Sequence, residues 1–138
     1  VLMTLIPFPL PVPSIDNHYW FDKCKEHVLV LQQCKLCEQF NHPPRPNCAY
    51  CGSSDLDWIE SHGKGTIFTF TVTRQPVSRP LLGRIPWVVV EVELDEGVHM
   101  ISNLIDFQDE DIQIGMAVQL VFEQVDDDIT LPKFKLVV

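Results

Sequence analysis

The sequence predicts a mainly β protein, in which a short N-terminal helix and a metal-binding ribbon precede a five-stranded barrel of the OB type. Three observations predict this fold. The chain has 138 residues, about the size of one domain, and 46% of them are hydrophobic, which is ample for one core. Two Cys-x-x-Cys pairs lie close together in the first half. The second half consists of short apolar runs between turn residues, which favours a small barrel, with a β-sandwich as the competing architecture.

Residues 1–13 are predicted to form a proline-rich arm. Prolines occupy every second position from 7 to 13, which favours an extended or polyproline II conformation. Apolar residues alternate with them, so the arm is suited to lie across a surface or a partner, and a poorly ordered terminus is the alternative. The arm lacks the basic start and cleavage site of a secretory signal. Because the chain also lacks an apolar run of roughly 18 residues, we expect a cytoplasmic protein without a membrane span.

The second segment, residues 14–56, is predicted to hold a helix and then the metal ribbon. The helix is expected over residues 16–27, where Trp20 and Cys24 share one face and should be buried. Cys24 is therefore interpreted as a small packed hydrophobe rather than a reactive thiol, since no cationic neighbour that would lower its pKa is evident. A short β run over residues 28–31 leads into the ribbon.

Four cysteines form the most specific motif of the chain. Cys34 and Cys37 make one Cys-x-x-Cys turn, and Cys48 and Cys51 make another, ten residues later. Each turn brings two thiolates to metal-ligand spacing, and two facing turns complete a tetrahedral four-sulfur site. Such a site is coordinatively closed and leaves no position for water or substrate. The metal is therefore predicted to be a structural zinc ion, whose binding folds a segment too small to fold alone.

Two other interpretations of these cysteines remain open. Two disulfides would use the same residues, but the chain has five cysteines and no secretion signal, which argues against them. Iron is the other alternative, as in a rubredoxin-like electron carrier, because the same four thiolates bind either metal. Such carriers consist almost entirely of the two turns, whereas most of this chain lies elsewhere.

The third segment, residues 57–138, is predicted to be the barrel. Gly63 and Gly65 suit a tight bend or a close backbone approach where the barrel begins. A turn at residues 95–97 carries Gly97 at a position suited to positive φ. The expected strands cover residues 66–73, 87–94, 98–105, 116–125 and 131–137, with one helical turn at 109–112 and a polar turn at 126–128.

The charge of the chain argues against nucleic-acid binding. The net charge is −9, and residues 70–138 contribute twelve acidic and five basic residues, a net of −7. Nucleic-acid binding depends mainly on Lys and Arg that neutralise phosphates. Phe68 and Phe70 share one strand face and could stack bases, so a single-stranded nucleic-acid-binding OB protein is retained as an alternative function. Alternating aromatic residues are more often barrel core.

No catalytic constellation is evident in the sequence. The five histidines are scattered and lack a carboxylate at motif spacing, and no nucleophile is paired with a base. We therefore expect a protein that is not an enzyme on its own.

An ordered series of motifs runs from about residue 17 to residue 135. It comprises a Tyr-Trp helix start, the two Cys-x-x-Cys turns around Pro-Pro-Arg, Gly-x-Gly, Leu-Asp-Glu-Gly, Ile-Gly-Met and Leu-Pro-x-Phe. Apart from the double cysteine turn each motif is weak, but their order is specific. The chain resembles the acyl-CoA-associated family in which a rubredoxin-like zinc ribbon precedes an OB fold, long filed as a domain of unknown function.

The resemblance implies a zinc-binding accessory subunit of an acyl-CoA-processing complex. Its partner would be a thiolase-like enzyme, an acyltransferase or aldolase, or a MaoC-like hydratase. The partner would supply the chemistry, and this subunit would stabilise it and shape its CoA or acyl site. Trp20 and Arg45 match the aromatic residue of the family's helix and the arginine of its Pro-Pro-Arg motif, which makes them predicted partner contacts. Glu38 departs from the family, which often has Gly there, and Glu tolerates positive φ poorly.

One loop stands out from the acidic half of the chain. Residues 74–86 hold three of its five basic residues, Arg74, Arg79 and Arg84. Long loops on a rigid scaffold often carry binding, and Arg suits bidentate phosphate contact. The loop is therefore a candidate to contact a CoA phosphate or an acidic partner surface, with a merely solvated connection as the third interpretation.

Overall fold

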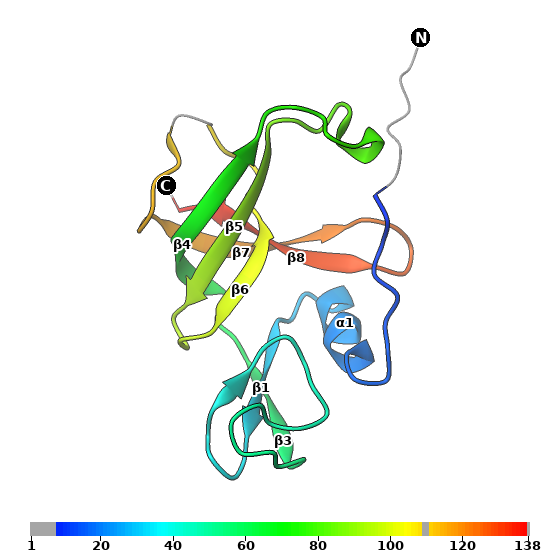
Figure 1. Cartoon of the computed structure of the whole chain (residues 1–138), viewed down its shortest axis with the longest axis vertical. Coiled ribbons are helices and arrows are strands. Elements are labelled where there is room, and N and C mark those ends of the chain that lie inside the picture. The colour runs from blue at the N-terminus through cyan, green and yellow to red at the C-terminus, as the bar shows by residue number, and fades with distance from the viewer. Residues whose placement is uncertain (1–7, 109–110, 138) are drawn as a thin grey trace.

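A computed structural model describes residues 8–108 and 111–137 and shows two sheets joined by a short linker (Figure 1). The smaller sheet has the strand order β2-β1-β3, and the larger has the order β6-β5-β4-β7-β8. Residues 1–7 of the predicted arm, and residues 109–110 of the predicted helical turn, lie outside the described part of the chain. In that part, no helix is long and apolar enough to cross a membrane.

Helix α1 (His18–Lys25) is shorter than predicted because the chain leaves the helix at His27. His27 has φ +61°, and its N–H donates to the carbonyl of Cys24, while the N–H of Val28 donates to that of Lys23. This pair of bonds is a Schellman ending, which usually has glycine at the left-handed position. The helix buries Cys24 completely, which confirms its interpretation as a packed residue, and burial raises the pKa of its thiol to about 12.

The ribbon sheet consists of β1 (Val30–Cys34), β2 (Phe40–Asn41) and β3 (Leu56–Glu60). β3 spans the predicted boundary between residues 56 and 57 and pairs antiparallel with β1 over its whole length. The linker that follows β3 leads directly into the barrel.

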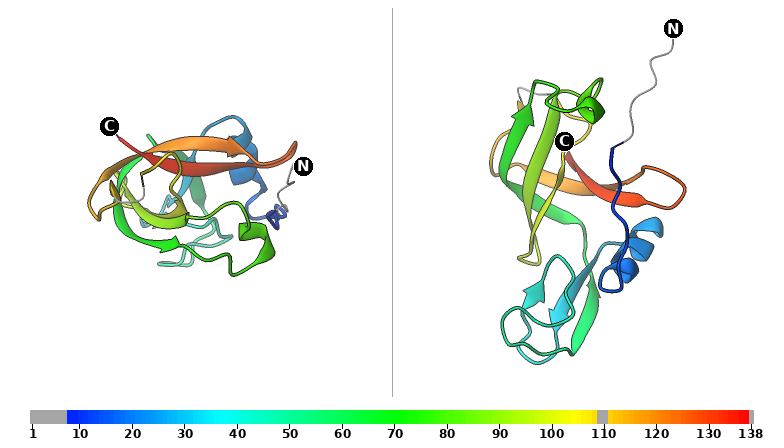
Figure 2. Two further views of the ribbon diagram at one scale, coloured as in Figure 1. Left: turned by 90° about the horizontal axis from the view of Figure 1, so that it is seen from above. Right: turned by 45° about the vertical axis from the view of Figure 1, so that its right-hand side comes forward.

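The larger sheet forms the predicted barrel, nearly closed when seen from above (Figure 2). The two outer strands, β6 and β8, are joined by a β-bridge between Leu104, which follows β6, and Phe134 on β8. All five strands are predicted to within about two residues at each end, and the competing sandwich is not formed. The strands are β4 (Lys64–Thr73), β5 (Trp87–Leu94), β6 (His99–Asn103), β7 (Ala117–Gln124) and β8 (Thr130–Leu136), with a short 3₁₀ turn η1 (Arg79–Leu81) between β4 and β5.

Alternation along β5 fills the barrel. Val88, Val90, Val92 and Leu94 are each at most 1% exposed, while the residues between them face outward. The same core extends through Phe134 to the helix and the ribbon, so both sheets share one apolar cluster.

The two glycines at the start of the barrel permit close packing, as predicted. Gly63 has φ +71°, and a Cβ built on it would lie 2.7 Å from the Cβ of Leu120. A Cβ on Gly65 would collide with the carbonyl oxygen of Glu93 on β5. The strands could not approach this closely with larger residues at these positions.

Candidate metal centre

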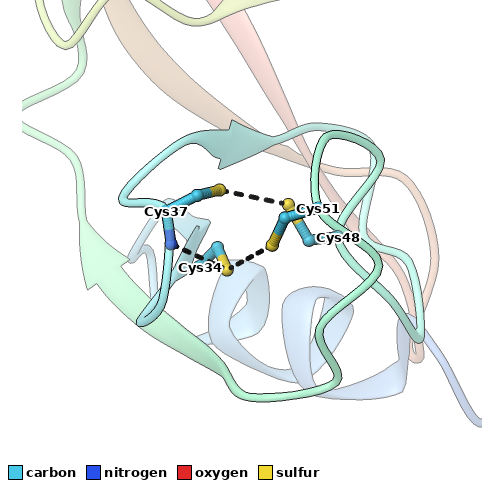
Figure 3. Close-up of side chains that lie close together, drawn as sticks. All are labelled: Cys34, Cys37, Cys48 and Cys51. Carbon is cyan, nitrogen blue, oxygen red and sulfur yellow. Dashed lines mark hydrogen bonds between the residues drawn. The ribbon is translucent and has the colours of Figure 1, made fainter.

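Four thiols converge in the ribbon (Figure 3). Cys34 ends β1, Cys37 follows it on a turn, and Cys48 and Cys51 lie on the loop that precedes β3. All four sulfur atoms lie within 4.8 Å of one another. The distances are 3.5 Å between Cys34 and Cys51 and 3.6 Å between Cys37 and Cys48. Thiolates about 2.3 Å from a tetrahedral zinc ion are roughly 3.8 Å apart, so the donor set fits that metal.

The two cysteine turns have the same backbone geometry. The first cysteine of each turn donates its N–H to the carbonyl five residues on, Cys34 to Gln39 and Cys48 to Ser53. Its carbonyl accepts the N–H of the residue four positions on, which is Glu38 in the first turn and Gly52 in the second. This repeated hydrogen-bond pattern holds each pair of thiols on one side of its turn.

Hydrogen bonds to sulfur favour the thiolate form. The Cys48 sulfur accepts from the side chain of Asn41 and from the N–H of Tyr50, each at 3.4 Å, and the Cys34 sulfur accepts from the N–H of Cys37 at 3.4 Å. The bond from Asn41 is the main reason that the pKa of Cys48 falls to about 6. Asn41 is 3% exposed and also accepts the N–H of Ala49. It therefore ties β2 to the second cysteine turn.

Asn41 and Gln32 are buried polar residues that sequence reasoning missed. Gln32 accepts the N–H of Arg45 at 2.8 Å and donates to its carbonyl at 3.0 Å. These bonds fix the backbone of the Pro-Pro-Arg-Pro segment to β1 and leave the Arg45 side chain exposed. An amide side chain between the predicted β run of residues 28–31 and the first cysteine is the one signal that could have identified Gln32.

The other predicted contact residues lie in different surroundings. Trp20 is only 8% exposed, and most of its ring belongs to the core. Arg79 begins η1 and is exposed, as is Arg74 at the end of β4. Arg84 donates to the carbonyl of Pro80 at 2.6 Å, and its guanidinium lies 4.8 Å from the centre of the Phe8 ring. Their roles in binding stay predictions.

One of the five histidines lies against two carboxylates. His99 does contact carboxylates, because β5 and β6 pair side by side: its Nδ1 lies 3.1 Å from Glu91 and its Nε2 3.1 Å from Glu93. Because Glu91 and Glu93 lie on the strand paired with that of His99, their contacts leave no motif of short spacing along the sequence. The ring also meets Phe68 edge to face. The three charged residues form an ion-pair cluster on the β5–β6 hairpin.

Comparison with known proteins identifies both parts of the chain. Residues 21–57 match the rubredoxin-like zinc ribbon domain of ChsH2, and residues 58–123 match its C-terminal OB-fold domain. A solved chain of the Ltp2-ChsH2(DUF35) aldolase is 37% identical, with a TM-score of 0.85, over 94% of this chain and 100% of that one. The chain belongs to the ChsH2 family.

Other ChsH2-family relatives differ in length. A probable enoyl-CoA hydratase alpha subunit of Thermomonospora curvata is 39% identical over 127 residues, which are 92% of this chain but 39% of the relative. A DUF35 domain-containing scaffold protein of Methanocaldococcus jannaschii is 28% identical over 79% of this chain and 77% of its own length. The chain thus spans well under half of the hydratase subunit and most of the scaffold protein. A DUF35-family structure from Sulfolobus solfataricus, 11% identical with a TM-score of 0.61, shares the fold.

Proposed function

We propose that this chain is a non-catalytic, zinc-binding accessory subunit of an acyl-CoA-processing complex. The observation that carries the proposal is the likeness to a solved ChsH2 chain that forms part of an aldolase. The whole of that ChsH2 chain aligns with this one. The ribbon and the barrel together therefore correspond to the part of ChsH2 seen in that aldolase. The relative named as a hydratase subunit points to the same class of acyl-CoA chemistry.

The metal centre supports a structural role. Cys34, Cys37, Cys48 and Cys51 would hold one zinc ion, and four protein thiolates leave no open position for a substrate. The ion would fix the ribbon and with it the surface that the chain offers to a partner. Zinc content near one ion per chain in colourless protein would support this assignment, and a red protein with charge-transfer absorption would identify iron.

The loop of residues 74–86 is the surface that we assign to the partner enzyme. It carries three arginines and no carboxylate in a chain of net charge −9. Apolar side chains are exposed on the same loop: Val77 is 78%, Leu82 46% and Ile85 37% exposed. Apolar residues next to arginines are typical of protein interfaces and unnecessary for phosphate contact, which favours an acidic protein surface over a CoA phosphate.

Co-purification tests this function and the choice of partner. The chain is co-expressed in turn with a thiolase-like aldolase and with a MaoC-like hydratase, and each mixture is analysed by size-exclusion chromatography with light scattering. We expect a stable complex with the thiolase-like enzyme and higher acyl-CoA turnover than by that enzyme alone. Turnover by this chain without a partner would contradict the non-catalytic role, and a complex with the hydratase alone would reassign the partner.

Charge reversal tests the docking loop. Arg79→Glu combined with Val77→Asp should abolish the complex while leaving the chain folded, since both side chains are exposed. Lys64→Glu, an equal reversal at an exposed position on β4 outside the loop, is the matched control. If the loop variant binds as tightly as the control, the partner docks elsewhere.

A further inference from the structure

A hollow of about 700 Å³ lies where the N-terminal segment crosses the barrel. Its walls come from residues 8–11, the start of β5, the end of β6, and the hairpin between β7 and β8. Both Figure 1 and Figure 2 show the N-terminal segment running across this hairpin. The volume lies within the range of small-molecule sites, and none of the four metal-binding cysteines lines it.

Lys133 is the unusual residue of this hollow. It is 6% exposed, yet among the described residues its ammonium bonds only the side-chain oxygen of Asn103, at 2.7 Å, and lies 5.2 Å from the centre of the Trp87 ring. No carboxylate in the described part of the chain lies within ion-pair distance of it, although Glu123 on the rim contributes a favourable field. Burial lowers the pKa of Lys133. A buried ammonium without a counter-charge is costly, so an anion at this point would stabilise it.

More than half of the remaining wall is apolar, and Arg84, Glu123 and Gln124 are among its polar members. The Trp87 ring stacks on Phe8 at 4.7 Å, and Leu10, Val125 and Leu131 continue the surface. The Asp126 carboxylate, which also lines the hollow, accepts the backbone N–H groups of Asp128 and Ile129 and so belongs to its own turn. The hollow therefore combines one buried cation with an apolar surface.

We propose that this hollow binds a small organic anion, with its acidic group at Lys133 and its apolar body against Trp87 and the β7–β8 hairpin. The Lys133 ammonium has N–H groups besides the one that it donates to Asn103, and the anion would accept hydrogen bonds from them. The segment of residues 8–11 forms the outer wall, and Arg84, which lies over Phe8, adds a second positive charge at the entrance. This site lies apart from the zinc centre, and Arg84 at its edge also belongs to the loop of residues 74–86 that we assign to the partner enzyme.

Two fluorescent probes of matched shape test the proposal. The first, 8-anilinonaphthalene-1-sulfonate, carries an anion on an aromatic body, and the second, N-phenyl-1-naphthylamine, has the same body without the charge. We expect saturable binding of one sulfonate probe per folded chain and at least about tenfold weaker binding of the neutral probe, the loss expected for a charge-assisted hydrogen bond. Equal affinity for the two probes, or no saturable binding, would overturn the proposal.

Substitutions then locate the site. Lys133→Met, which keeps an unbranched side chain of similar length, should weaken binding of the sulfonate probe about tenfold. Binding of the neutral probe should be unchanged. Lys64→Met on β4 is the matched control and should change neither. Asn103→Asp places a carboxylate beside the ammonium and so neutralises its charge without removing it. This variant should also weaken binding of the sulfonate probe, and it keeps the test valid if Lys133→Met does not fold. Unchanged sulfonate affinity in a folded Lys133→Met or Asn103→Asp variant would show that the anion does not bind at Lys133.

Discussion

Glu38 occupies in the first cysteine turn the position that Gly52 occupies in the second. Both residues have positive φ, +64° and +79°, and both donate their N–H to the carbonyl of the first cysteine of their turn. Glycine adopts this conformation freely, whereas an L side chain there costs on the order of 1 kcal/mol. The first turn is therefore the more strained half of the metal centre.

Glu38→Gly should relieve this strain. We expect zinc to be released more slowly to a chelator and the midpoint of thermal unfolding to rise, because the turn would prefer its metal-bound shape. Gly52→Ala should do the reverse and destabilise the ribbon by about 1 kcal/mol. Gln39→Gly, next in the chain and without positive φ, is the control and should only destabilise. A Glu38→Gly variant that loses zinc faster than the native chain would refute the strain argument.

Loss of one ligand should unfold the ribbon. Cys48→Ser leaves three thiolates, and since metal binding supplies much of the folding free energy of so small a segment, zinc content and ribbon stability should fall together. Zinc is measured by metal analysis and ribbon structure by amide hydrogen exchange of β1 and β3. Cys24→Ala, which removes the buried thiol of α1, should keep one zinc ion per chain. Full zinc occupancy in Cys48→Ser would contradict a four-ligand site.

Asn41 should tune the metal site through Cys48. Asn41→Asp keeps the acceptor for the N–H of Ala49 but replaces the donor to the Cys48 sulfur with a negative charge. The pKa of Cys48 should rise above its native value of about 6, and zinc affinity should fall about 10- to 100-fold. Competition with a chelator measures the affinity. Asn47→Asp also removes an amide donor from this loop, but one that bonds the Gly52 carbonyl at 3.2 Å and not a sulfur atom, so it should lower zinc affinity less.

The sequence predicted the parts of this fold that depend on local patterns. The cysteine spacing located all four thiols, and the alternation of Val88, Val90 and Val92 located the central barrel strand. The end of α1 was predicted too late because His27 takes the left-handed position there in place of glycine, which would have marked the end of the helix in the sequence. Contacts between distant segments, such as Phe8 on Trp87, leave no local pattern and could not be predicted.

His99 should make stability depend on pH. Its hydrogen bond with Glu91, together with the nearby charge of Glu93, raises the pKa of the His99 ring above its usual value of 6.5. The folded state therefore binds a proton more tightly than the unfolded state. The stabilisation is fully present below about pH 6.5 and is lost as the pH rises through the higher folded pKa. His99→Gln should remove this dependence in unfolding curves measured from about pH 5 to pH 9, and His18→Gln, a change at an exposed histidine of α1, should retain it.

Glu96 should hold the linker between the ribbon and the barrel. From the β5–β6 turn, its carboxylate accepts the Ser61 hydroxyl at 3.1 Å and the N–H of His62 at 2.9 Å, and the Ser61 oxygen in turn accepts the N–H of Gly63. Glu96→Gln weakens two charge-assisted bonds and should lower the free energy of unfolding by roughly 1 kcal/mol. It should also speed proteolytic cleavage within the linker, because local opening exposes the backbone there. Asp95→Asn, which removes the neighbouring exposed charge, is the control; equal cleavage of the two variants would show that the linker is held by packing alone.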